Sequence, residues 1–229
     1  MVSKQAVAKL KKIVEKYKYE IDLPKMGRWK TMSDNDLWTA IIIQVVVVGG
    51  SAPHVAVKEQ LNSQENWYAQ LLELSDGKRR TAIHKVLLSC GVRYVSESVE
   101  DCRKTKALVK NLALVESHEG PKAYLKGISK IPEGSRRIAV IIDEMSYIKN
   151  KGARDFLIGV GLLEDAIAFD VRVKNVLEFC GIPLPDDLAT NKNTYKELES
   201  ELIEKVCWPL QISGSVLDRI LYQKYKEIV

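Results

Sequence analysis

The sequence predicts an all-α fold with at least eight helices. Along several segments apolar residues recur at three- and four-residue steps, the spacing that places them on one face of a helix. Capping-box patterns precede several later segments, and glycines stand where others would end. One short run alone has the composition of a β-strand, and a lone strand has no partner for its backbone hydrogen bonds.

The first helix is expected at the amino terminus, with lysines on its polar face. Its apolar face consists of Val2, Ala6, Val7, Leu10, Ile13, Val14 and Tyr17. Capping boxes predict four later helix starts, at Ser33–Asp36, Ser98–Asp101, Thr194–Glu197 and Ser215–Asp218. Pro121 suits the first turn of another helix, and Gly91 and Gly181 suit helix ends.

The strand-like run is Ile41–Val48, which is β-branched apart from Gln44. Since no second strand of similar strength lies nearby, we expect a fully buried helix instead. It should begin near Ser33 and end at Gly49-Gly50. Burial must then override a poor intrinsic helix propensity.

Composition limits the classes of protein to consider. The 229 residues are 46% hydrophobic and 28% charged, which fits one large globular domain or two closely packed lobes. The net charge is +5. The first 30 residues alone have a net charge of +6, with nine Lys/Arg against three Asp/Glu, so the rest of the chain is close to neutral. Such a segment could contact phosphates or be a solvated helix face.

The expected compartment is intracellular, without membrane attachment. The amino terminus lacks the apolar core of a signal peptide, and the longest apolar run is too short to cross a bilayer. Four scattered cysteines, Cys90, Cys102, Cys180 and Cys207, are expected to be reduced thiols rather than metal ligands. Nothing in the sequence calls for a metal or an organic cofactor.

The segment from Ser146 to Gly181 is the most informative. A helix that begins near Ser135 should end at Tyr147-Ile148, and a polar turn should follow at 149–152. A short helix, 153–160, then has Phe156, Leu157 and Val160 facing inward, and Gly161 ends it. Asp165 can cap the next helix, and Asp170 lies near the start of a further one. The chain thus predicts two short helices joined by a hairpin.

This segment resembles the active-site motif of the helix-hairpin-helix DNA glycosylase superfamily, most closely the archaeal and bacterial 8-oxoguanine glycosylase/lyases. Their motif has a catalytic lysine, an alanine two residues later, a Phe-Leu pair, a glycine, and an aspartate 18 or 19 residues after the lysine. The matching residues are Lys151, Ala153, Phe156-Leu157, Gly161 and Asp170.

The resemblance implies a two-lobed helical glycosylase fold with the active site in the cleft between the lobes. A central lobe, 37–170, would contain the hairpin at about 135–161, and residues 1–36 and 171–229 would form the second lobe. The expected activity is base-excision repair of an oxidised purine, 8-oxoguanine above all, with apurinic-site lyase activity. The expected partner is double-stranded DNA with a damaged base, bound by a monomer.

Two residues would perform the chemistry. Lys151 can attack the anomeric carbon and form a Schiff base, and the carboxylate of Asp170 can stabilise the positive charge that develops on the sugar. Asp170 can also be a plain N-cap. Burial would lower the pKa of Lys151 and a nearby Asp170 would raise it, so the sequence leaves that balance open.

Residues around the hairpin are the predicted DNA contacts, since helix N-termini and turn N–H groups bind phosphates. They are Lys149, Asn150, Gly152, Arg172, Gly50 and Ser51. Tyr147 and Lys149 occupy places where the family usually has glycine, and Arg172 stands where histidine is common. In the turn 49–51, relatives often present an Asn or Gln that fills the gap left by the flipped base.

The base pocket is predicted from aromatic and terminal residues. Trp38 could stack on a flipped base, as could Trp67, Tyr68 or Trp208, although each suits a core position equally well. The carboxy-terminal stretch resembles the terminal helix of the same glycosylases and offers Lys224 and Lys226. Two alternatives stay open: the same superfamily acting on a mismatched or alkylated base, and a non-catalytic helix-hairpin-helix binding module.

Overall fold

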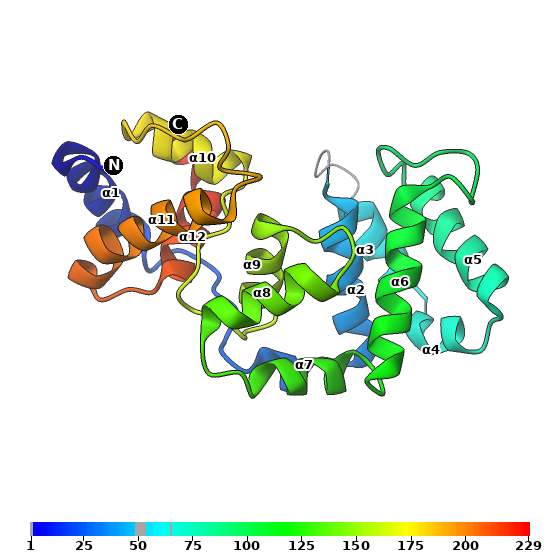
Figure 1. The fold of residues 1–229 in the computed structure, drawn as a ribbon. Coiled ribbons are helices and arrows are strands. Elements are labelled where there is room, and N and C mark those ends of the chain that lie inside the picture. The colour runs from blue at the N-terminus through cyan, green and yellow to red at the C-terminus, as the bar shows by residue number, and fades with distance from the viewer. Residues whose placement is uncertain (1, 49–53, 65) are drawn as a thin grey trace. The chain divides into compact units, whose positions relative to one another are not determined.

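The structure is a computed structural model that describes residues 2–48, 54–64 and 66–229. Every regular element in these residues is helical, which confirms the all-α class (Figure 1). No helix in this part of the chain combines the length and the apolarity needed to cross a membrane.

The chain forms two compact units. One comprises the chain up to Met26 together with Asn150–Val229, and the other comprises Gly27–Lys149. These bounds differ from those of the predicted lobes, which placed residues 27–36 with the termini and residues 150–170 in the central lobe. The segment 150–170 belongs with the terminal unit because its polar contacts are with helices late in the chain, Glu199 and Asp218 among them.

The unit Gly27–Lys149 is built around a buried helix. Its elements are η1 (Arg28–Lys30), α2 (Asp34–Val46), α3 (His54–Asn62), α4 (Trp67–Leu72), α5 (Asp76–Ser89), α6 (Arg103–Ser117), α7 (Pro121–Ser129) and α8 (Gly134–Glu144). Helix α2 packs against α3, α4, α6 and α7. The run Ile41–Val46 is therefore helical, as expected, and the predicted capping box joins Ser33 and Asp36.

Other helix boundaries in this unit partly follow the sequence. Pro121 is the first residue of α7, and Gly91 adopts a left-handed φ of 63° just after α5. The predicted start at Ser98 is wrong. Its hydroxyl does accept the Asp101 N–H, but only within a turn, and α6 begins after Cys102.

The terminal unit contains both ends of the chain. Its elements are α1 (Lys4–Tyr17), α9 (Asn150–Gly159), α10 (Val171–Phe179), α11 (Lys192–Leu202), the π-helix η2 (Ile203–Cys207), η3 (Trp208–Leu210), α12 (Gly214–Gln223) and α13 (Tyr225–Ile228). The apolar face of α1 packs into one core with α10, α11 and α12. Gly181, with φ of 87°, follows α10 as predicted.

Two predicted helix starts in this unit are wrong by two or three residues. Helix α11 is capped by Asn191 rather than Thr194, whose hydroxyl instead donates to Asp187. Helix α12 is capped by Ser213, so Ser215 and Asp218 lie inside the helix. Both predicted capping boxes have the correct residue spacing, but another residue two or three positions earlier is the N-cap.

The cysteines are free thiols throughout the described residues. Cys102, Cys180 and Cys207 are buried and Cys90 is half-buried, so three of the four are core residues as expected. Within the same ranges no three His, Cys, Asp or Glu side chains gather as metal ligands.

Candidate functional site

The predicted nucleophile lies in the first turn of a helix. Helix α8 ends at Glu144, and α9 begins at Asn150 after a five-residue connection. Lys151 and Gly152 are therefore helical, whereas the sequence placed them in the turn. Arg154 explains the earlier start, because its guanidinium donates to the carbonyl of Asn150 (3.1 Å) and closes the first turn.

The rest of α9 follows the prediction. Phe156, Leu157 and Val160 are buried, and Gly161 ends the helix with a left-handed φ of 72°. Asp165 caps no helix of its own and instead accepts the backbone N–H of Gly214 (3.3 Å). The buried face of α9 leaves its first turn free to present Lys151, whose side chain is 34% exposed.

The connection before α9 contains a residue in a conformation that favours glycine. Tyr147 has a φ of 69°, at a position where the resembled family usually has glycine. The buried Asn111 fixes the preceding residue, since its side chain accepts the N–H of Ser146 (2.7 Å) and donates to its carbonyl (3.1 Å). The backbone thus keeps the left-handed turn although the glycine is absent.

Three buried side chains hold the segment that leads to Asp170. Successive backbone N–H groups at 167, 168 and 169 donate to Glu199 (2.8 Å), Asp218 (2.8 Å) and the Tyr195 hydroxyl (2.9 Å). Tyr195 also donates to the carbonyl of residue 167 (2.9 Å). A segment without regular secondary structure satisfies its backbone N–H groups in this way.

A buried ion pair fixes Glu199 in turn. The guanidinium of Arg154 makes two hydrogen bonds of 2.7 Å to the Glu199 carboxylate, and their side chains are only 5% and 8% exposed. The same guanidinium lies 4.0 Å from the centre of the Tyr195 ring. Arg154 therefore links the helix that carries Lys151 to the segment that carries Asp170.

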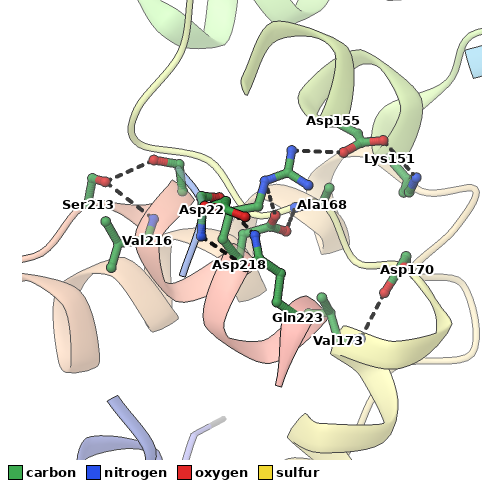
Figure 2. Close-up of polar contacts among 12 residues, drawn as sticks. Asp22, Lys151, Asp155, Ala168, Asp170, Val173, Ser213, Val216, Asp218 and Gln223 are labelled. Atoms are coloured by element: carbon green, nitrogen blue, oxygen red, sulfur yellow. Dashed lines mark hydrogen bonds and ion pairs between the residues drawn. The ribbon is translucent and has the colours of Figure 1, made fainter. Parts of the chain in front are cut away.

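Asp170 is the N-cap of α10. Its carboxylate Oδ1 accepts the N–H of Val173 at 2.8 Å (Figure 2). Of its two neighbours in the chain, Phe169 is buried and Val171 is 67% exposed. Asp170 is half-buried, at the end of a segment that buried side chains hold by hydrogen bonds.

Lys151 is surrounded by carboxylates. Its ammonium lies 3.2 Å from Asp155 Oδ2, one helical turn later, as Figure 2 shows. Burial pushes the pKa of Lys151 down, but the charge and hydrogen bond of Asp155, with the charges of Asp170 and Asp218, raise that pKa above its ordinary value. The balance left open by the sequence therefore favours the protonated amine.

Asp155 is shared with an arginine of α12. Its Oδ1 lies 3.2 Å from Arg219 Nη2, and Arg219 Nε lies 3.8 Å from the carboxylate of Asp218. Asp218 is 2% exposed. Its burial raises its pKa from 3.8 to about 7, with Asp155 and Asp170 adding to the rise and Arg219 and the Ala168 N–H opposing it.

The predicted DNA-contacting residues differ in exposure. Lys149 and Arg172 are exposed, and the Arg172 guanidinium lies 4.7 Å from the centre of the Tyr222 ring. Asn150 is buried and Gly152 half-buried within α9, so neither is the open turn residue that the sequence suggested. Gly50 and Ser51 lie outside the described residues.

Most of the residues predicted for the base pocket are buried or paired with carboxylates. Trp38 is 0% exposed in the core around α2, and Trp67 and Tyr68 are buried too, which leaves them no free face for a base. Lys224 is engaged with Glu20 (3.0 Å) and Glu227 (3.2 Å). Lys226 is exposed, as is Trp208.

Sequence reasoning missed the residues that surround Lys151 and Asp170. Asp155 had a visible signal, because a lysine and an acid four residues apart meet on one helix face. Asp218 is predicted as the end of a capping box, although the two charged residues Asp218-Arg219 inside the apolar stretch SVLDRILY suggest buried polar partners. Glu199 and Tyr195 had no local signal.

Comparisons with known proteins agree with the fold. No family model matches the chain, and no curated protein matches it significantly. Among solved structures, 8-oxoguanine DNA glycosylase of Methanocaldococcus jannaschii is similar, with a TM-score of 0.70, 13% identity, and 97% of this chain and 94% of that chain covered. The 8-oxoguanine DNA glycosylase of Thermotoga maritima has a TM-score of 0.67, 18% identity, and coverage of 94% and 93%.

A third similar structure contains DNA. It is the Methanocaldococcus jannaschii 8-oxoguanine glycosylase/lyase in complex with a 15mer DNA containing 8-oxoguanine. Its TM-score is 0.67 at 15% identity, with 97% of this chain and 98% of that chain covered. The chain therefore has the helical fold of these glycosylases over nearly its whole length.

Proposed function

We propose that the protein is a DNA glycosylase with lyase activity that excises a damaged base from double-stranded DNA. The observation that carries this proposal is the placement of Lys151 and Asp170. A partly exposed amine in the first turn of α9 and a carboxylate at the end of a hydrogen-bonded segment interact electrostatically within one unit. A non-catalytic binding module has no need of that pair.

In the proposed reaction, the Lys151 amine attacks the anomeric carbon of a nucleotide flipped out of the duplex. The new carbon–nitrogen bond forms as the glycosidic bond breaks, and the base leaves with the electron pair. Asp170 stabilises the positive charge that develops on the sugar. Opening of the sugar gives a Schiff base, from which β-elimination cuts the strand.

Phosphate binding is assigned to the residues that precede and begin α9 and α10. Lys149 offers an exposed ammonium, the N–H groups at the start of α9 point toward the helix N-terminus, and Arg172 offers a guanidinium at the start of α10. Such contacts read no bases, which suits an enzyme that must act in many sequence contexts.

The proposed substrate is an oxidised purine, with 8-oxoguanine first. The support is the substrate named for the structural neighbours, one of which holds DNA containing 8-oxoguanine. A different lesion, such as a mismatched or alkylated base, would leave the assignment of Lys151 and Asp170 unchanged and alter only the base pocket.

The proposal is tested by borohydride trapping on a panel of duplexes that carry 8-oxoguanine, a mismatch, an alkylated base, an abasic site or no lesion. We expect a covalent protein–DNA adduct, fastest with 8-oxoguanine among the damaged bases. Lys151→Gln should abolish the adduct but keep duplex binding, because phosphate contacts supply most of that affinity.

The matched control is Lys196→Gln, which removes an exposed lysine of α11 in the same unit and should trap like the wild type. An absence of adduct from every duplex would refute the lyase activity. Adduct formation that favours a mismatched or alkylated base would move the substrate to that lesion.

A further inference from the structure

A row of alternating charges leads from Lys151 into the protein. Asp155 stands between two cations. Its Oδ2 lies 3.2 Å from Lys151 Nζ (Figure 2), and its Oδ1 lies 3.2 Å from Arg219 Nη2. Arg219 is followed by the buried Asp218, at 3.8 Å. The side chains of Asp155 and Arg219 are mostly buried, so water screens this arrangement less than it would a surface pair.

This surrounding creates a chemical difficulty for a nucleophilic lysine. An ammonium has no lone pair and cannot attack carbon until it loses a proton. The charged and titratable groups that act on Lys151 are Asp155 from its own helix, Asp170 from the start of α10, and Asp218 from α12. Together these carboxylates hold Lys151 in the protonated form, so a base must be close at hand.

We propose that Asp155 is the base that takes the proton from Lys151, and that Arg219 is a positioning residue that holds Asp155 in place for this transfer. The inference rests on the proposed function. The proton moves from Nζ to Oδ2, which converts the ammonium and carboxylate into an amine and a carboxylic acid. The lone pair thus released on Nζ forms the bond to the anomeric carbon.

The other two carboxylates are less suited to this role. Asp170 uses Oδ1 to cap α10, and its proposed task requires that it stay charged beside the sugar. Asp218 accepts the Ala168 N–H, is almost fully buried, and has no hydrogen bond to Lys151 among the described contacts. Asp155 is hydrogen-bonded directly to the ammonium.

Arg219 explains why Asp155 would keep the correct geometry. Because Arg219 binds Oδ1, the second oxygen is directed at Lys151, and the carboxylate is prevented from turning away. The same ion pair places the positive charge of Arg219 on the side of Asp155 that faces away from Lys151.

The test is the pH dependence of single-turnover borohydride trapping on an abasic-site duplex, from about pH 6 to about pH 9, below the ordinary lysine pKa. With an internal base, the ammonium–carboxylate pair is present across this range, so the wild-type rate should be nearly level, with only a small change near pH 7, where the buried Asp218 ionises. In Asp155→Asn the Lys151 ammonium must lose its proton to solvent, so the rate should be about 100-fold below the wild-type rate near pH 6. The rate should then rise about tenfold per pH unit up to the Lys151 pKa, which loss of the Asp155 charge also lowers.

Two further variants sharpen the result. Asp155→Glu keeps a base and should restore a level profile. Glu201→Gln removes the carboxylate of another i,i+4 pair, with Lys205, and should leave the profile unchanged. Circular dichroism checks that each variant is folded.

The inference is overturned if the wild-type rate itself rises tenfold per pH unit, in parallel with the rate of Asp155→Asn. In that case the wild-type protein still forms the adduct, so the proposed function stands. The wild-type slope alone decides this point if Asp155→Asn does not fold. No adduct from wild-type protein at any pH would refute the proposed function, and the inference with it.

Discussion

Replacing Arg154 by methionine should destabilise the terminal unit strongly. The guanidinium makes both hydrogen bonds to Glu199, one to the Asn150 carbonyl, and a contact with the Tyr195 ring. Methionine keeps much of the volume but leaves the Glu199 carboxylate in a site where it is 8% exposed. Loss of one partner of a buried ion pair costs about 3–5 kcal/mol, and we expect a decrease of that size in the unfolding free energy.

The assay is urea unfolding followed by circular dichroism, with two companion variants. Arg154→Met/Glu199→Gln removes the orphaned charge and should recover at least about 1 kcal/mol relative to Arg154→Met alone. Arg80→Met breaks the exposed ion pair with Glu100 and should cost less than about 1 kcal/mol. A loss from Arg154→Met as small as that from Arg80→Met would refute the argument that this pair anchors the site.

Three more predictions concern single residues of the site. Asp218 keeps its proton in the folded chain up to about pH 7 but loses it near pH 3.8 in the unfolded chain. It therefore favours the folded state below about pH 4 and loses that effect as the pH rises to about 7. Asp218→Asn should remove up to about 1.4 kcal/mol per pH unit from the slope of unfolding free energy against pH, and an unchanged slope would contradict this. Gly214→Ala should cost about 1–3 kcal/mol in thermal unfolding, because its Cβ would lie 2.8 Å from the backbone nitrogen of Ala166; a neutral result would mean that this segment shifts easily. Asp170→Asn should slow excision about 100-fold in single-turnover assays while stability changes little, since the amide oxygen can still cap α10, and an unchanged rate would reduce Asp170 to a cap.

Local patterns account for the parts of the structure that the sequence predicted. The helix α2 was recognisable despite its β-branched residues because no second strand lies nearby in the sequence and because Ser33 and Asp36 form a capping box at its start. Lys151 and Asp170 were recognisable because their spacing along the chain is part of a motif. Each of these signals lies within about 20 residues of sequence, where residue spacing alone carries the information.

The remainder of the site depends on contacts between distant segments. The N–H groups of residues 167, 168 and 169 find partners 32, 50 and 26 residues away, and no local rule selects those partners. The same limit explains the wrong capping box at Ser215. Its spacing to Asp218 fits the rule, but Asp218 is used by Ala168 instead, and Ser213 caps the helix.

The most direct test of the central claim is to identify the residue that becomes linked to DNA. After borohydride reduction on a duplex with 8-oxoguanine, nuclease and protease digestion followed by mass spectrometry should place the sugar remnant on the peptide that contains Lys151. A remnant on another lysine or on the terminal amine would contradict the assignment of Lys151 as the nucleophile.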